Sequence, residues 1–66
     1  MHYEVFYIDN STGWAFAKFD KSRNQVSEAE FYFHKREAVM MANEEANGLE
    51  VRVFTKNGRQ QGVSGK

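Results

Sequence analysis

The sequence of 66 residues predicts one α+β domain, in which a single helix packs on one face of a small sheet. Two observations lead to this prediction. Segments rich in β-branched and aromatic residues alternate with clusters of turn-forming residues, which is typical of strands joined by loops. One longer segment instead places its alanines at helical spacing. The expected order is β-β-β-α-β, with three or four strands in a mostly antiparallel sheet.

Three segments that precede the helix are each predicted to form a strand. They cover residues 2–8 (HYEVFYI), 14–19 (WAFAKF) and 28–33 (EAEFYF). Residues 9–13 (DNSTG) favour a turn, because Asp, Asn, Ser and Gly stabilise turn conformations. A loop of about five residues is ordinary for a hairpin, so the first two strands should pair in antiparallel fashion. Residues 20–27 are polar and predict a loop.

The predicted helix lies within residues 33–48 (FHKREAVMMANEEANG). Asn47 and Gly48 are expected to stop it in a left-handed conformation. Three alanines on its inner face would let the helix lie close to a sheet. The residues at helical spacing on that face are Ala38, Met41, Ala42, Glu45 and Ala46, with Val39 at the border.

Residues 49–54 (LEVRVF) alternate strictly and predict the last strand. A strand–helix–strand connection should place this strand parallel to the third one, with a right-handed crossover. Residues 56–66 contain Val63 as their one apolar side chain. We therefore expect a compact domain over residues 1–55 and a polar, disordered tail over residues 56–66.

Composition argues against several classes of function. Lys plus Arg number 9 and Asp plus Glu also number 9, so the chain is neither a general polyanion binder nor an acidic DNA mimic. The sequence contains no cysteine, two histidines, no Gly-rich phosphate loop and no nucleophile elbow. We therefore expect no enzymatic activity, no metal and no cofactor. Without a signal peptide or a long apolar run, a cytoplasmic protein without membrane contact is expected.

The charges of the predicted helix run against its dipole. Lys35 and Arg36 lie near the start and Glu44 and Glu45 near the end, whereas the dipole favours the reverse. Unpaired N–H groups at a helix start can bind an anion. The predicted topology brings the helix start and the end of the last strand to one pole. Candidate residues for an anion or nucleic-acid site there are His34, Lys35, Arg36, Lys56 and Arg59.

The alternative is that these cations are solvated surface residues without a binding role. The acidic helix end lies at the other pole, within expected reach of Lys21 and Arg23, so that pole can neutralise itself.

One helix can cover only one face of the sheet, so apolar residues remain for the other face. Alternation assigns the helix side to Tyr3, Val5, Tyr7, Trp14, Phe16, Phe31, Phe33, Leu49, Val51 and Val53. A register slip of one residue would turn the side chains of a strand to the opposite face of the sheet. The candidate partner-binding residues on the uncovered side are Phe6, Ile8, Phe19, Tyr32 and Phe54, with Ala15 and Ala17 between them.

An uncovered apolar face usually marks an interface, so we expect a protein partner or a homodimer. Two alternatives remain open. Single-stranded nucleic acid could stack on the exposed aromatic rings, as it does on other sheet-type binders. The long polar loops and the tail could also cover the face in part.

The order of short motifs resembles a family of small bacterial and phage proteins, known as domain of unknown function two-one-eight-eight. The matching motifs are Tyr3-Glu4-Val5, Trp14-Ala15-Phe16, Lys35-Arg36-Glu37-Ala38, Ala42, Ala46, Leu49-Glu50-Val51 and Gly58-Arg59. They cover most of residues 3–59. His34 stands where the family has Thr or Ser, and Glu45 where it has a leucine-like residue. The resemblance implies the fold and no established activity.

The sequence thus predicts a small, non-enzymatic regulatory module from a bacterium or phage. Its expected working surface is the uncovered sheet face, which would bind a protein partner or a second copy. The alternative is a nucleic-acid-binding protein that uses the basic pole and the sheet aromatics. No small-molecule cofactor is expected in either case.

Overall fold

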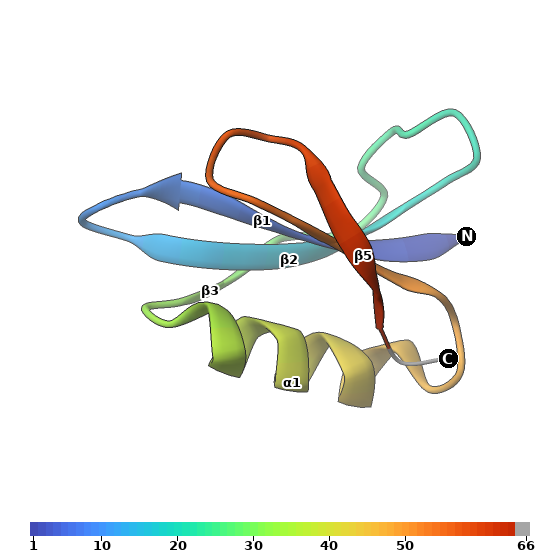
Figure 1. Cartoon of the computed structure of the whole chain (residues 1–66). Coiled ribbons are helices and arrows are strands. Elements are labelled where there is room, and N and C mark those ends of the chain that lie inside the picture. Colours follow the sequence, from blue (N-terminus) through green and yellow to red (C-terminus); the bar gives the residue numbers. More distant parts are fainter. Residues whose placement is uncertain (65–66) are drawn as a thin grey trace.

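The computed structural model describes residues 1–64, which form a five-stranded mixed sheet with one helix on one face (Figure 1). This arrangement confirms the predicted α+β class. The sheet has five strands, however, rather than three or four. The elements in chain order are β1 (His2–Asp9), β2 (Gly13–Phe19), β3 (Glu30–Tyr32), α1 (Lys35–Ala46), β4 (Val51–Phe54) and β5 (Gln60–Ser64).

The strand order β3-β2-β1-β4-β5 puts β1 at the centre of the sheet. β1 pairs with β2 in antiparallel fashion and with β4 in parallel, with Tyr3 opposite Val51 and Val5 opposite Val53. β4 therefore runs in the same direction as β3, as the crossover predicts, but lies beside β1. Because β1 has a partner on both edges, Tyr3 and Val5 are fully enclosed.

The fifth strand lies in the segment that was expected to be a disordered tail. A turn at Asn57 and Gly58 reverses the chain, and β5 then pairs with β4 in antiparallel fashion, with Arg52 opposite Val63. The turn is closed by the Thr55 N–H, which donates to the Arg59 carbonyl at 2.8 Å. Apolar periodicity missed β5 because its pairing uses backbone groups on the free edge of β4. Residues 65–66 of the expected tail lie outside the described part of the chain.

The helix ends where the sequence predicts. Asn47 adopts the left-handed conformation (φ 50°, ψ 49°), and the Leu49 N–H donates to the Ala46 carbonyl at 3.1 Å. Ala38, Ala42 and Ala46 are buried against the sheet. Their small side chains let α1 lie close to the strands, and larger side chains come from the sheet. No helix within residues 1–64 has the length and apolar character needed to cross a membrane.

The core between α1 and the sheet contains most of the residues assigned to that side. Those buried there from the sheet are Tyr3, Val5, Trp14, Phe16, Val51 and Val53, and Tyr7 packs against them.

The predicted faces of β3 are reversed. Trp14 pairs with Tyr32, so Tyr32 faces the helix and stacks on Phe16 with ring centres 6.0 Å apart and planes within 7°. The three residues that we expected inside but that are exposed are Phe31, Phe33 and Leu49. The cause for Phe31 is a register one residue away from the predicted one, which turns each side chain of a strand to the other face.

Gly13 offers a direct test of the packing at the start of β2. It has φ +95°, and a Cβ at this position would lie 2.5 Å from the Phe33 carbonyl oxygen. Gly48 has φ +101°, but a Cβ there would meet no atom within 4 Å. Both Gly→Ala variants carry the backbone cost of a positive φ, about 1–2 kcal/mol. We expect Gly13→Ala to lower the free energy of unfolding in urea clearly further than Gly48→Ala. Equal losses would show that β2 and residues 32–33 separate without cost.

Candidate functional site

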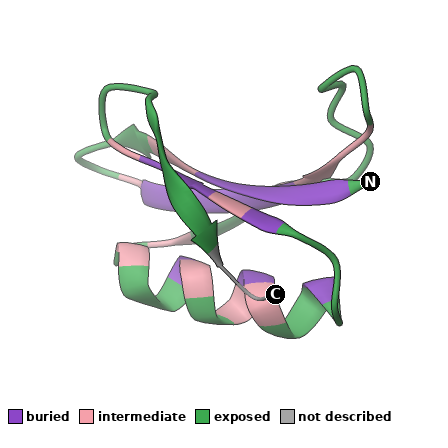
Figure 2. Ribbon diagram, turned by 45° about the vertical axis from the view of Figure 1, so that its right-hand side comes forward, coloured by how far each residue is buried: buried purple, intermediate pink, exposed green. Residues whose placement is uncertain are grey.

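The sheet face opposite α1, here called the open face, has no helix over it. Figure 2 shows two loops that rise at its ends on the side away from α1: the β2–β3 loop and the β4–β5 turn. Alternation, register and a shared hollow place the following residues on the open face: His2, Glu4 and Phe6 of β1, Ala15, Ala17 and Phe19 of β2, Phe31 of β3, Arg52 and Phe54 of β4, and Val63 of β5.

A strip of apolar side chains crosses one part of the open face. Phe6 pairs with Ala15, which in turn pairs with Phe31, so the three side chains form a row across three strands. Ala15 is fully buried in this row, whereas Phe31 is 57% exposed. Ile8 lies at an irregularity in the pairing of β1 with β2 and is 39% exposed. Phe6 and Phe31 are called the apolar strip below.

The predicted partner-binding residues differ from the expectation in their burial and in the face on which they lie. Phe6 and Phe19 are half-buried and meet edge to face, with ring centres 6.2 Å apart. Phe54 is buried at 9% exposure, and Tyr32 lies on the helix side. Phe31 is an exposed aromatic residue of the open face that the sequence analysis assigned to the helix side. Its position follows from the pairing of Tyr32 with Trp14, and this register cannot be deduced from the alternation of residues in the sequence.

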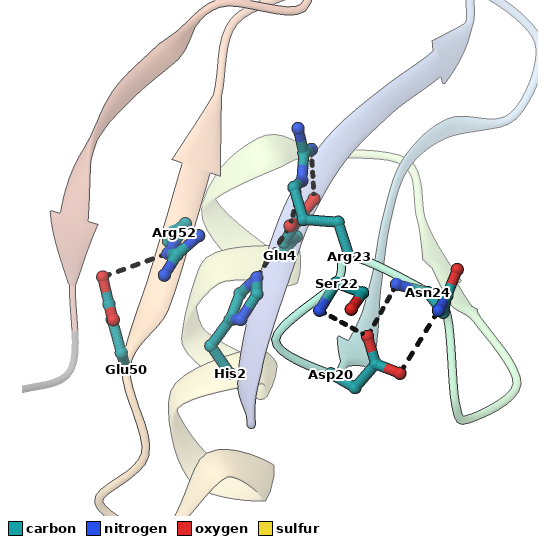
Figure 3. A network of polar contacts seen from close by, with 8 residues as sticks. All are labelled: His2, Glu4, Asp20, Ser22, Arg23, Asn24, Glu50 and Arg52. Carbon is teal, nitrogen blue, oxygen red and sulfur yellow. Dashed lines mark hydrogen bonds and ion pairs between the residues drawn. The ribbon is translucent and has the colours of Figure 1, made fainter.

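A buried carboxylate organises the other part of the open face (Figure 3). Glu4 is 3% exposed, and its two oxygens accept hydrogen bonds from Arg23 Nε at 3.0 Å and Arg23 Nη2 at 2.9 Å. His2 Nε2 lies 2.7 Å from Oε2 of the same carboxylate. The His2 ring also stacks on Phe19 at 6.0 Å. Glu4 is thus a buried ionic centre on the open face, with His2 and Arg23 as its partners.

The β2–β3 loop holds Arg23 in place. The Asp20 carboxylate accepts hydrogen bonds from the backbone N–H groups of Ser22 and Asn24, each at 2.9 Å (Figure 3). Arg23 adopts a positive φ of 62°, and its guanidinium carbon lies 5.3 Å from the centre of the Phe54 ring. The side chain therefore turns back over the open face, between Glu4 and Phe54. The expected neutralisation of Arg23 by the acidic helix end is wrong, since its partner is Glu4.

The pKa of Glu4 reflects two opposing effects. Burial on its own would raise the pKa, but hydrogen bonds from Arg23 and His2, together with their charges, lower it below the ordinary value. The same contact raises the pKa of Arg23, whose charged form the carboxylate stabilises. Backbone N–H groups lower the pKa of Asp20, chiefly the one of Asn24. The carboxylates that hold the loop are therefore ionised at neutral pH.

Arg23 and the β4–β5 turn enclose a hollow of about 280 Å³ on the open face. Its floor is apolar, and its two rims are polar. Phe6, Phe19 and Phe54 form the floor, next to Glu4. Arg23 and Gln25 line one rim, and Thr55 and Lys56 line the other. The hollow unites residues from both ends of the sequence, so local motifs do not reveal it.

The residues of the predicted basic pole do not form one continuous surface. Lys35 Nζ lies 5.2 Å from the Trp14 ring centre, and Lys35 also donates a hydrogen bond to Gln61. Lys56 Nζ lies 5.2 Å from the ring centre of Tyr7. Because Trp14 and Tyr7 meet edge to face, also at 5.2 Å, the two ammonium groups flank an aromatic pair.

The other members of the predicted pole face elsewhere. His34 caps the helix with its backbone alone, since its side chain makes no capping hydrogen bond. His34 and Arg36 line a second hollow together with Glu37 and Met40. Arg59 lies in the β4–β5 turn, where its N–H donates to Thr55 Oγ1 at 3.3 Å. Lys35 and Lys56 thus meet at the Tyr7–Trp14 pair, whereas His34 and Arg36 line a different hollow.

No family model, curated protein or solved structure matches this chain. The resemblance to the domain of unknown function therefore stays a prediction.

Glu4 should make the stability of the fold depend on pH. Its pKa in the folded protein is lower than the ordinary value of 4.5, so its contribution is complete above that pH and is lost as the pH falls through the lower, folded value. We expect Glu4→Gln to reduce the free energy of unfolding at pH 7 by about 1–3 kcal/mol and to flatten its decrease in acid. Urea unfolding across a pH series measures both effects.

Glu50→Gln is the matched control, because Glu50 pairs with Arg52 at 3.1 Å while 42% of its side chain is exposed. Surface ion pairs contribute about 0–1 kcal/mol, so this variant should keep the acid dependence of the parent. If Glu4→Gln unfolded in acid with the same pH profile as the parent protein, the ionic centre would not be the source of that dependence.

The two cations at the helix start should respond differently to charge reversal. Arg36→Glu places an acid where the helix dipole favours one, so we expect stability to be unchanged or to rise by up to about 1 kcal/mol. Lys35→Glu should show no such gain, because it removes the contacts with Trp14 and Gln61. Thermal melts of both variants test this difference. A gain of equal size in both would show that the Lys35 contacts contribute nothing.

Proposed function

We propose that this chain is a small, non-enzymatic regulatory module that binds a protein partner, or a second copy of itself, through the open face. The observation that supports this function most is the apolar strip. Phe31 is more than half exposed beside Phe6, on a face that no helix covers. Exposed apolar side chains that lie side by side are typical of interaction surfaces, whereas single exposed residues are common everywhere.

The charges around the strip favour a protein over a nucleic acid as the partner. Glu4 places a negative charge within the open face and already binds the guanidinium of Arg23. Lys35 and Lys56 each contact an aromatic ring of their own chain. Binders of single strands combine exposed aromatic rings with cations that follow the phosphate backbone. On the open face, the Glu4 carboxylate lines the same hollow as Phe6 and Phe19 and repels a phosphate backbone.

Chain length gives an independent reason for association. A domain of about 60 residues buries only about 60% of the surface that its unfolded chain exposes. Binding of a partner to the folded state alone stabilises that state by mass action. A partner on the apolar strip would thus both perform the proposed function and remove exposed apolar surface from water.

Phe31→Glu tests the proposed surface. Sedimentation velocity over a concentration series shows whether the parent protein self-associates. If it does, we expect Phe31→Glu to give monomers with an unchanged melting temperature, because Phe31 contributes little to the core. Met40→Glu is the matched control, since Met40 is 53% exposed on the outer side of α1. Dissociation by Met40→Glu instead would place the interface on the helix.

If the parent protein is strictly monomeric, the proposed partner is a different protein rather than a second copy of this chain. A photo-cross-linkable phenylalanine analogue then replaces Phe31 in one variant and Met40 in another, and both are expressed in a bacterial host. Cross-linked protein at position 31 and not at position 40 is the expected result. Cross-linked nucleic acid at position 31, or equal products at both positions, would contradict the proposal.

A further inference from the structure

The hollow beside the apolar strip has a size and a lining that suit one side chain of a partner. Its volume of about 280 Å³ is at the lower limit of pockets for drug-sized ligands, which are about 300–1,000 Å³. The rings of Phe6, Phe19 and Phe54 give it an apolar, aromatic floor. Aromatic side chains pack edge to face against such rings and bury a large apolar area. The floor therefore favours an aromatic side chain.

Arg23 adds a directed hydrogen-bonding surface at the rim. A guanidinium carries five N–H groups, and Glu4 accepts from Nε and from Nη2. Both N–H groups of Nη1 and one of Nη2 therefore remain, and within residues 1–64 no oxygen accepts from them. The side chain of Arg23 is 58% exposed, so these donors are accessible from solvent.

Glu4 and the aromatic floor hold this arginine in one orientation. Two hydrogen bonds fix one edge of the guanidinium, and Phe54 lies against its plane. A group that is already ordered loses less conformational entropy when it binds a ligand. The charged residues that line the hollow are Glu4, Arg23 and Lys56, and the Lys56 ammonium lies 5.2 Å from the Tyr7 ring centre. The remaining N–H groups of Arg23 are complementary to one carboxylate of a ligand, since arginine binds carboxylates with two parallel bonds.

We infer that the hollow is the docking site for a partner segment in which an aromatic residue stands next to an acidic residue. The aromatic side chain would lie on Phe6, Phe19 and Phe54, and the carboxylate would accept hydrogen bonds from Arg23. This inference rests on the proposed function, since it names the chemistry of the protein partner. A nucleotide fits less well, because the hollow is small for a base and sugar together and the Glu4 carboxylate repels a doubly charged phosphate.

The test is an NMR titration of the isotope-labelled full chain with short peptides. The probe is acetyl-Trp-Glu-amide. The matched probes are acetyl-Trp-Lys-amide, which reverses the charge, and acetyl-Ala-Glu-amide, which removes the ring. We expect acetyl-Trp-Glu-amide to shift the backbone signals of Phe6, Arg23 and Thr55, and to bind at least about tenfold more tightly than either matched probe.

Variants of the hollow separate binding from folding. Arg23→Gln should weaken binding of acetyl-Trp-Glu-amide about tenfold, while Arg52→Gln, on the open face but paired with Glu50, should leave it unchanged. Because Arg23→Gln also releases Glu4, Gln25→Glu serves as a second variant. It adds a negative charge to the rim and keeps both Arg23 and Glu4. We expect this variant to bind acetyl-Trp-Glu-amide more weakly and acetyl-Trp-Lys-amide more tightly than the parent protein does.

Several outcomes would overturn the inference. They are equal binding of all three peptides, signal shifts outside the hollow, no binding at millimolar peptide, or preferential binding of adenosine monophosphate as a fourth probe. Phe31 does not line the hollow, so its variants test the proposed function separately. Cross-linking at position 31 without peptide binding would contradict this inference alone. Peptide binding in the hollow without association at position 31 would contradict the apolar strip as the contact surface.

Discussion

The parallel pairing of β1 with β4 is the constraint on which the rest of this fold depends. Parallel strands need a long crossover, and here the connection from β3 at the sheet edge to β4 beside β1 contains α1. The helix must therefore lie across one face of the sheet, and three alanines let it lie close. Within residues 1–64 there is no second helix for the other face, so the open face is a direct result of this connection.

The open face is stabilised by polar as well as apolar contacts. In its apolar part, Phe6 and Phe31 flank the buried Ala15. In its polar part, the β2–β3 loop brings Arg23 over Glu4 and Phe54. A buried carboxylate without a partner would be strongly destabilising, so the loop conformation and the charge in the sheet depend on each other. The β2–β3 loop places Arg23 over one part of the open face and does not extend over the apolar strip. The open face is therefore divided into an uncovered strip and a hollow lined by Arg23.

The sequence was sufficient to predict those features that depend on local pattern. Helical spacing of the alanines predicted the buried face of α1, and Asn47 and Gly48 predicted its end. The face of β3 could not be predicted, because a strand of three residues contains too little alternation to fix a register that depends on pairing with β2. β5 was missed because backbone groups, rather than apolar side chains, determine its pairing.

The candidate site was less predictable than the fold. Phe6 lies on the open face, as alternation along β1 predicted, since it pairs with Ala15 in the regular part of that strand. The contact between Glu4 and Arg23 was missed because charge attraction alone does not select one acid among several. That choice depends on the left-handed backbone at Arg23 and on the Asp20 contacts that hold it. Motifs of a few residues therefore indicated which side chains were available, and tertiary structure determined which of them meet.

The central position of β1 also has a consequence for how the chain folds during synthesis. β1 leaves the ribosome before its two partner strands, and β2 can cover one of its edges soon afterwards. Its other edge waits for Val51 and Val53, which are made about fifty residues later. Contacts of such sequence separation form slowly, because loop closure must precede them. Until then, an unpaired edge rich in aromatic residues is accessible to other nascent chains, which makes this interval the one in which aggregation competes most strongly with folding.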